Sequence, residues 1–211
     1  MSELLLIGGG GHCKAAIDVI EQEGSFSIVG VTTKKIGECE SVLGYPVLGT
    51  DDDLSSLVRD DRFFLVTIGQ INTSEPRITA FNRATGIGMQ PVSIRSPKAY
   101  VSPHAAIGNG TLIMHGAVVN ADAQVGINSI VNSLALVEHD SIIGDHCHIS
   151  TGAKINGNVI VGEKSFIGSG AVLRNGISVG ARSVIGAGCY VNFDVPEDAI
   201  VRSSRKDVRN G

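Results

Sequence analysis

The sequence predicts two folded parts: an α/β N-terminal domain with a small Rossmann-like parallel sheet, and then an all-β parallel β-helix of hexapeptide repeats. An aliphatic residue recurs at every sixth position through the second half of the chain, whereas the first half alternates short apolar runs with helical spacing. The chain also has 27 glycines and only 4% aromatic residues. Glycine without the three-residue period of collagen indicates many tight backbone turns.

The six-residue repeat runs from Val101 to Val191 without a slip in register. Its members are all aliphatic, and all but one are β-branched: Val101, Ile107, Ile113, Val119, Val125, Val131, Val137, Ile143, Ile149, Ile155, Val161, Ile167, Leu173, Val179, Ile185 and Val191. A second column four residues later holds mostly small side chains. This period fits short strands stacked coil on coil, with the aliphatic column inside. A β-sandwich is the alternative, which the unbroken register disfavours, and periodicity alone leaves the handedness open.

The first part of the chain shows the pattern of a parallel α/β domain. An apolar run at 4–7 is followed by four glycines at 8–11 and by apolar residues at helical spacing up to Ile20. Further strands are expected at 27–31 and 63–68, with a helix at 74–85.

These patterns divide the chain into four segments. We expect an α/β domain at 1–90, a linker at 91–100 that contains two prolines, the β-helix at 101–196 and a basic tail at 197–211.

Composition excludes several classes of function. The net charge of −4 gives no reason to expect nucleic-acid binding, and no apolar run approaches the roughly 18 residues of a membrane span. The four cysteines are scattered without CxxC spacing, which disfavours a zinc site or a disulfide framework. We therefore expect a reduced cytoplasmic protein without a metal.

The glycine turn Gly8–Gly11, with His12 after it, is a candidate phosphate-binding site because backbone N–H groups at a helix N-terminus point toward an anion. Cys13 occupies the place of the third glycine of the dinucleotide fingerprint, and no acidic residue follows the second strand. NAD is therefore disfavoured. A mononucleotide or nucleotide-sugar remains open beside a purely structural turn.

The segment Glu138-His139-Asp140 is the second candidate for chemistry. An acidic neighbour can hold one imidazole nitrogen and leave the other as a base. The alternative is a histidine on a surface turn. No nucleophile is evident, since Ser141, Cys147 and Cys189 occupy the small-residue column and are expected in the core.

The chain resembles the NeuD/PglD group of bacterial sugar acetyltransferases, within the left-handed β-helix acyltransferases. The resemblance covers nearly the whole chain. It rests on Leu-Leu-Ile-Gly-Gly-Gly-Gly-His at 5–12, on Thr-Ile-Gly-Gln at 67–70 and on the segment 132–159, which contains Val-Glu-His-Asp-Ser-Ile-Ile-Gly-Asp-His-Cys-His at 137–148.

The resemblance implies a role for individual residues. His139 matches the catalytic base and Asp140 the acid that orients it, while His148 and Gly157 match residues at the acetyl group of acetyl-CoA. Asn132 matches an active-site asparagine. The resemblance assigns the nucleotide-sugar to the N-terminal domain, where the expected binding residues are Gly8, Gly9, Gly10, Gly11, His12, Lys34, Gly69 and Gln70. It also implies a homotrimer with active sites between adjacent β-helices.

The chain departs from the group's pattern at two places. Thr32 to Lys35 stand where the group often has acidic residues that contact the nucleotide base. Arg202 to Lys206 replace a Gly-x-Pro-Ala-Lys segment near the CoA adenine. Arg205 and Lys206 are therefore candidates to bind CoA phosphates, with a solvated basic tail as the alternative.

The predicted function is acetyl-CoA-dependent N-acetylation of a nucleotide-linked 4-amino-6-deoxy-sugar in surface-glycan biosynthesis. O-acetylation of sialic acid or a related sugar is the alternative, and a non-catalytic trimeric scaffold comes from a different class. A metal-dependent hexapeptide enzyme is disfavoured, because His115, His139 and His148 do not form an evident ligand set.

Overall fold

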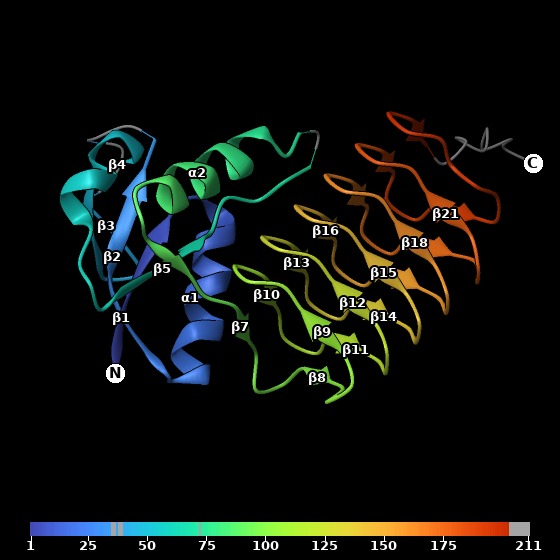
Figure 1. Cartoon of the computed structure of the whole chain (residues 1–211), viewed down its shortest axis with the longest axis horizontal. Helices are drawn as coiled ribbons and strands as arrows, with labels where there is room; N and C mark the ends of the chain where they lie inside the picture. The colour runs from blue at the N-terminus through green and yellow to red at the C-terminus, as the bar shows by residue number, and fades with distance from the viewer. Residues whose placement is uncertain (35–36, 38–39, 72, 203–211) are drawn as a thin grey trace, which may run out of the picture.

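The computed structural model describes residues 1–34, 37, 40–71 and 73–202, and shows an α/β domain beside a stack of β-helical coils (Figure 1). The N-terminal sheet has the strand order β3-β4-β2-β1-β5-β6. Its strands are β1 (Ser2–Ile7), β2 (Phe26–Thr33), β3 (Ser41–Val42), β4 (Tyr45–Thr50), β5 (Arg62–Val66) and β6 (Gln90–Pro91). All neighbours are parallel except β3 and β4, which form an antiparallel pair.

Two α-helices cover opposite faces of this sheet. Alternate residues of β1 explain why: Leu4 and Leu6 pack with α1 (Gly11–Glu23), whereas Leu5 and Ile7 pack with α2 (Glu75–Gly86). A 3-10 helix, η1 (Asp51–Leu57), adds Leu54 to the α2 side. The carboxyl ends of β1, β2, β4 and β5 therefore share one edge of the sheet, where ligands bind in open α/β folds.

The β-helix consists of three parallel sheets, which form the three faces of a prism. The first holds β7, β10, β13, β16, β19, β22 and β24, the second β8, β11, β14, β17, β20 and β23, and the third β9, β12, β15, β18 and β21. Their bounds are β7 Ile94–Arg95, β8 Tyr100–Val101, β9 Ala106–Ile107, β10 Leu112–Ile113, β11 Val118–Val119, β12 Gln124–Val125, β13 Ile130–Val131, β14 Leu136–Val137, β15 Ile142–Ile143, β16 His148–Ile149, β17 Lys154–Ile155, β18 Ile160–Val161, β19 Phe166–Ile167, β20 Val172–Leu173, β21 Ser178–Val179, β22 Val184–Ile185, β23 Tyr190–Val191 and β24 Ile200–Val201.

The predicted aliphatic column fills the interior of the prism. From Ile113 to Val191 every member is at most 3% exposed, and small residues of the second column, such as Ala117 and Cys147, pack beside it. Glycines after the column allow the coils to approach. At Gly144, for example, a Cβ would lie 2.6 Å from the backbone nitrogen of Glu163 in the next coil.

A third column, which the sequence does not reveal, makes the corners. Every sixth residue from 110 to 188 has a positive φ, and the residues there are of mixed type: Gly110, Gly116, Asp122, Asn128, Leu134, Asp140, His146, Gly152, Asn158, Lys164, Gly170, Gly176, Arg182 and Gly188. Left-handed backbone favours Gly, Asn and Asp, which account for most of these positions. The mixture hides the period from inspection of the sequence.

The structure differs from the expected segment boundaries at both ends of the β-helix. β7 lies within the segment 91–100 expected as a linker, yet it already pairs with β10, and β8 begins at the last residue of that segment. β24 lies within the expected tail and pairs with β22. Stacking on a neighbouring coil extends the β-helix by one strand beyond the aliphatic register at each end, because backbone pairing does not require the repeat's side chains.

Candidate active site

His139 lies at the corner between β14 and β15, and its side chain is 60% exposed. Its Nδ1 atom lies 2.7 Å from Oδ2 of Asp140, whose left-handed backbone (φ 60°) belongs to the corner column. This hydrogen bond raises the pKa of His139 above its usual 6.5. A ring whose Nδ1–H is held by a carboxylate presents its Nε2 atom as a base. The structure thus brings together His139 and Asp140, as the sequence analysis expects.

Gly157 lies one coil further, directly under the His139 ring. A Cβ at this position would be 2.7 Å from Cε1 and 2.9 Å from Nε2 of His139, so any residue other than glycine would displace the ring. Among the described residues the Gly157 N–H has no hydrogen-bond acceptor within the protein. The corner therefore combines a base with a backbone donor, the pair that acyl transfer requires.

His148 occupies a different environment, on β16 where the β-helix meets the N-terminal domain. Its Nδ1 atom lies 2.6 Å from the carbonyl oxygen of Gln70, and its Nε2 atom lies 3.1 Å from Nδ2 of Asn132. The carbonyl can only accept, so Nδ1 carries the proton and Nε2 accepts from Asn132. Burial lowers the pKa of His148 to about 4, which keeps the ring neutral.

Three of the expected site residues thus meet at this domain seam: Gln70, Asn132 and His148. The amide of Gln70 also reaches across the seam, with Nε2 3.3 Å from the Lys164 carbonyl oxygen. His139 does not join them. It lies at the corner between the second and third faces of the prism, which is opposite the first face that carries His148.

A cavity of about 990 Å³ opens at the carboxyl edge of the N-terminal sheet. Its lining contains all of the residues of the N-terminal domain that are expected to bind the nucleotide-sugar, together with His148, whereas the expected active-site residue Asn132 does not line it: Gly8, Gly9, Gly10, Gly11, His12, Lys34, Gly69, Gln70 and His148. The N-terminus of α1 opens into it, and a Cβ at Gly10 or Gly11 would meet no protein atom within 4 Å. Gly8, by contrast, has φ 108° and packs against Ile68, so its role is in the turn itself.

His12 lies on the wall of this cavity, with its ring centre 6.2 Å from that of His148. Burial lowers its pKa to about 3, and its Nε2 atom has no hydrogen-bond partner in the described structure. A buried polar atom without a partner is costly, so the Nε2 atom of His12 is available to a water molecule or a ligand in this cavity.

Arg77 is a buried residue that the sequence did not single out. Its guanidinium binds the carbonyl oxygens of Val66 and Ile68 in the N-terminal domain and of Asn128 in the β-helix, at 2.7, 3.0 and 2.9 Å. Desolvation lowers its pKa to about 9. Arg77 fixes the end of β5, and hence Gln70, against the β-helix. An arginine within a helical segment gives no sequence signal for such a role.

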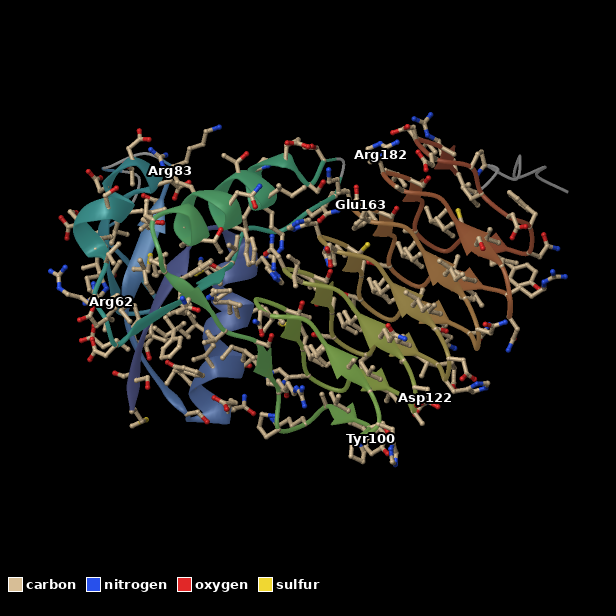
Figure 2. All side chains as sticks on the ribbon, viewed as in Figure 1. Arg62, Arg83, Tyr100, Asp122, Glu163 and Arg182 are labelled. Atoms are coloured by element: carbon tan, nitrogen blue, oxygen red, sulfur yellow. The ribbon has the colours of Figure 1, made fainter. Side chains whose placement is uncertain are left out.

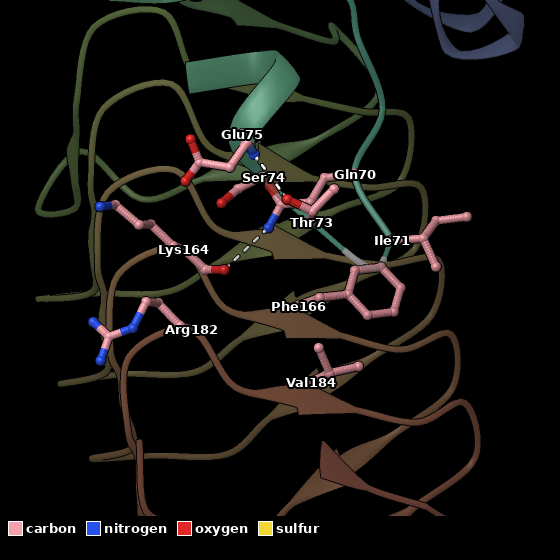
Figure 3. Close-up of a pocket in the computed structure, with 9 residues that line it drawn as sticks. All are labelled: Gln70, Ile71, Thr73, Ser74, Glu75, Lys164, Phe166, Arg182 and Val184. Atoms are coloured by element: carbon pink, nitrogen blue, oxygen red, sulfur yellow. Dashed lines mark hydrogen bonds between the residues drawn. The ribbon is translucent and has the colours of Figure 1, made fainter. Parts of the chain in front are cut away.

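A smaller cavity of about 140 Å³ adjoins the seam (Figure 3). Phe166 and Val184 stand in the same outward column as His148, one and two coils further on, and face Gln70 and Ile71. Figure 3 shows Lys164 and Arg182 along the side of this cavity. The expected CoA-binding residues Arg205 and Lys206 lie outside the described residues.

The other candidates from the sequence lie in the core or at separate sites. Ser141, Cys147 and Cys189 are buried, and burial raises the pKa of Cys147 to about 12. His115 bridges Ser96 and Asp18 at 2.6 and 2.8 Å. Within the described ranges no three His, Cys, Asp or Glu side chains gather in a metal-binding group, and no helix is long and apolar enough to span a membrane.

Comparison with known proteins decides the family. The model of the PglD N-terminal domain matches residues 3–78, and that of the hexapeptide repeat of succinyl-transferase matches 158–192. PerB from Caulobacter crescentus, solved with CoA and GDP-perosamine, is 32% identical with a TM-score of 0.87, over 95% of this chain and 93% of that one. The acetyltransferase domain of PglB from Neisseria gonorrhoeae, solved with acetyl coenzyme A, is 33% identical with a TM-score of 0.85, over 92% and 93%.

The chain belongs to the NeuD/PglD-type sugar acetyltransferases. Membership confirms the predicted fold class, with a left-handed β-helix, and the predicted class of enzyme, an acetyl-CoA-dependent sugar acetyltransferase. WeeI from Acinetobacter baumannii shares this fold at 23% identity, with a TM-score of 0.86 over 97% of this chain and 98% of that one. No curated protein matches the chain by sequence.

Proposed function

We propose that this family member transfers the acetyl group of acetyl-CoA to the amine of a nucleotide-linked 4-amino-6-deoxy-sugar, with His139 as general base. The observation that carries the proposal is the corner of His139, Asp140 and Gly157, where an oriented base stands over an unoccupied backbone N–H. Similarity to PerB, which was solved with GDP-perosamine, supports a nucleotide-linked amino-sugar as the acceptor.

The chemistry is direct transfer. The sugar amine, in its neutral form, attacks the thioester carbonyl carbon, and Nε2 of His139 takes the proton that the nitrogen loses. The Gly157 N–H donates to the carbonyl oxygen as it becomes negative. The tetrahedral intermediate then collapses with breakage of the C–S bond, and CoA leaves as the thiolate. No enzyme nucleophile is required, in agreement with the burial of Ser141, Cys147 and Cys189.

The proposed reaction needs the base His139 close to the acetyl group that His148 is expected to contact, but within one chain these two histidines lie apart. His139 stands at the corner opposite the face that carries His148, with the filled interior of the prism between them. We therefore propose that the site forms in a homotrimer, where the His139 corner of one chain faces the His148 side of its neighbour. Ile142 and Ile160 are exposed on the third face, which adjoins the His139 corner, and they support an interface there.

The pantetheine arm fits the outward column after His148. Phe166 and Val184 offer apolar contact, and Lys164 and Arg182 place positive charge beside it for the CoA phosphates. Glycan biosynthesis in the cytoplasm is the setting that we propose for such an activity.

The test is thiol release from acetyl-CoA with GDP-, dTDP- and UDP-linked 4-amino-6-deoxy-sugars, with sialic acid and the H139A variant in parallel. We expect turnover with at least one amino-sugar, loss of turnover in H139A, and a product that resists hydroxylamine, since amides resist it and esters do not. Turnover with sialic acid alone would replace N-acetylation by O-acetylation. Absence of turnover with every acceptor would favour a scaffold.

A further inference from the structure

The large cavity has a direction that the strand order sets. The residues that line it follow the strands in the order β4, β2, β1 and β5 along the carboxyl edge of the sheet. Asp51 follows β4, and Thr33 and Lys34 lie at the end of β2. The glycine turn follows β1, and Gly69 and Gln70 follow β5. Neighbouring strands lie about 4.8 Å apart, so three steps separate the Asp51 end from the Gly69 end by roughly 14 Å. His148 stands at the β5 end.

This order assigns the parts of a nucleotide-sugar, given the proposed function on which the inference rests. The sugar amine must lie at the His148 end, where acetyl-CoA is proposed to bind. The diphosphate belongs at the N-terminus of α1, in the middle of the cavity. The base must then lie at the opposite end, beside Asp51.

Asp51 differs from the two aspartates that follow it. Asp53 accepts from the backbone and the hydroxyl of Thr50 at the start of η1. Asp52 pairs at 2.7 Å with Arg83, which Figure 2 labels. Asp51 lines the cavity instead, and its Oδ1 atom accepts from the Thr32 hydroxyl at 2.9 Å. Its Oδ2 atom has no hydrogen-bond partner within the described part of the chain. The Thr32 hydroxyl thus orients a carboxylate that retains acceptor capacity.

We propose that Asp51 selects guanine as the nucleotide base by accepting hydrogen bonds from its N1–H and its 2-amino group. Guanine is the common base with two adjacent donors on one edge, which match the two oxygens of a carboxylate. Uracil and thymine offer one N–H between two carbonyl oxygens, and these oxygens would be repelled by the carboxylate. The acidic group that is missing after β2 is thus supplied by the next strand of the sheet, β4.

The experiment is isothermal titration of the full chain with GDP, IDP, UDP and dTDP at one salt concentration. IDP is the matched probe because it differs from GDP only in lacking the 2-amino group of the base. We expect IDP, UDP and dTDP to bind about tenfold or more weakly than GDP, as for the loss of a hydrogen bond to a charged acceptor. In D51N the GDP constant weakens about tenfold, and the gap between GDP and IDP closes to about twofold.

Asp61 provides the matched control, since it is exposed and precedes β5 at the opposite edge of the sheet. D61N removes the same charge and should leave all four affinities unchanged. Equal affinity for GDP and IDP, tighter binding of UDP or dTDP, no binding of any diphosphate, or an unchanged gap in D51N would overturn the assignment. These results are separate from the acetyl-transfer assay: a chain that acetylates a UDP-linked amino-sugar keeps the proposed function and loses the guanine assignment.

Discussion

The corner at His139 and the domain seam at His148 use the same side chain in opposite ways. The His139 ring is exposed, and Asp140 raises its pKa. His148 is only 6% exposed, and burial lowers its pKa to about 4. A carboxylate partner favours the imidazolium, and desolvation favours the neutral ring. The first histidine is therefore suited to proton transfer, and the second to a fixed pattern of hydrogen bonds.

Substitution of the two histidines, with the greatest loss of activity, tests whether His139 and His148 form one site across chains. H139A and H148A should each lower kcat by about a hundredfold or more. In trimers that contain both variants, whichever is in excess, one interface of three combines an intact His139 with an intact His148. Purification through two different tags selects these mixed trimers, in which we expect about one third of the native activity.

The control is a mixture of the separately purified variants without chain exchange, which should stay inactive. If co-expressed trimers are as inactive as the separate variants, the two histidines belong to the same chain's site, and the divided site is wrong.

The second effect concerns stability in acid. Above pH 6.5 His148 is neutral in both the folded and the unfolded chain, so it adds no pH dependence. Between pH 6.5 and 4 the unfolded chain binds a proton that folded His148 does not, so the free energy of unfolding falls with pH, by about 3 kcal/mol at pH 4. H148Q keeps a donor for the Gln70 carbonyl oxygen and lacks the titration.

Urea unfolding of both proteins at pH 7 and pH 4.5, at one protein concentration, measures this difference. The carboxyl groups are present in both proteins and cancel in the comparison. A charged His148 also lowers the pKa of the neighbouring His12, so the measured difference belongs to this pair of histidines. An equal loss of stability in wild type and H148Q would show that His148 takes up its proton without cost.

The smallest effect concerns the pH profile of catalysis. Because His139 must be neutral to act as a base, kcat/KM rises with pH through its raised pKa. D140N replaces the charged acceptor of this hydrogen bond by a neutral amide, so the midpoint of this step moves to lower pH. The amide can also present its NH₂ group to the ring, so the ring loses its fixed orientation and kcat/KM on the high-pH plateau falls about tenfold.

Asp122 is the matched control, since it occupies the same corner one coil earlier with φ 59° (Figure 2). D122N should leave the profile unchanged. A D140N profile that coincides with that of the wild type would exclude Asp140 as the orienting residue.

Much of the fold could be predicted from sequence because the β-helix repeats its core. One aliphatic side chain per six residues points inward in every coil, so each repeat is independent evidence for the same strand and the same buried position. The N-terminal domain offered fewer signals. β4 escaped prediction because Pro46 and Gly49 interrupt it, and β4 carries Asp51 into the cavity.

The site was predictable where neighbours in sequence are neighbours in space, as for His139 and Asp140. The contact between Gln70 and His148, and the buried position of Arg77, depend on how two domains pack together. No local pattern encodes such packing, so these contacts appear only in the folded chain. The expected roles of Asn132 and His148 came from the resemblance to a family and not from their spacing.

The left-handed corners have a consequence for how such an enzyme can change during evolution. The backbone turns at every sixth residue whether the residue is glycine, aspartate, asparagine, leucine, histidine, lysine or arginine. The turn itself therefore does not require one residue type, and aspartate is among the types that left-handed backbone favours. Asp140 is one of these corner residues, and it sits next to His139. Ancestral coils could thus gain or lose a catalytic pair by single substitutions, while the same stack continued to fold.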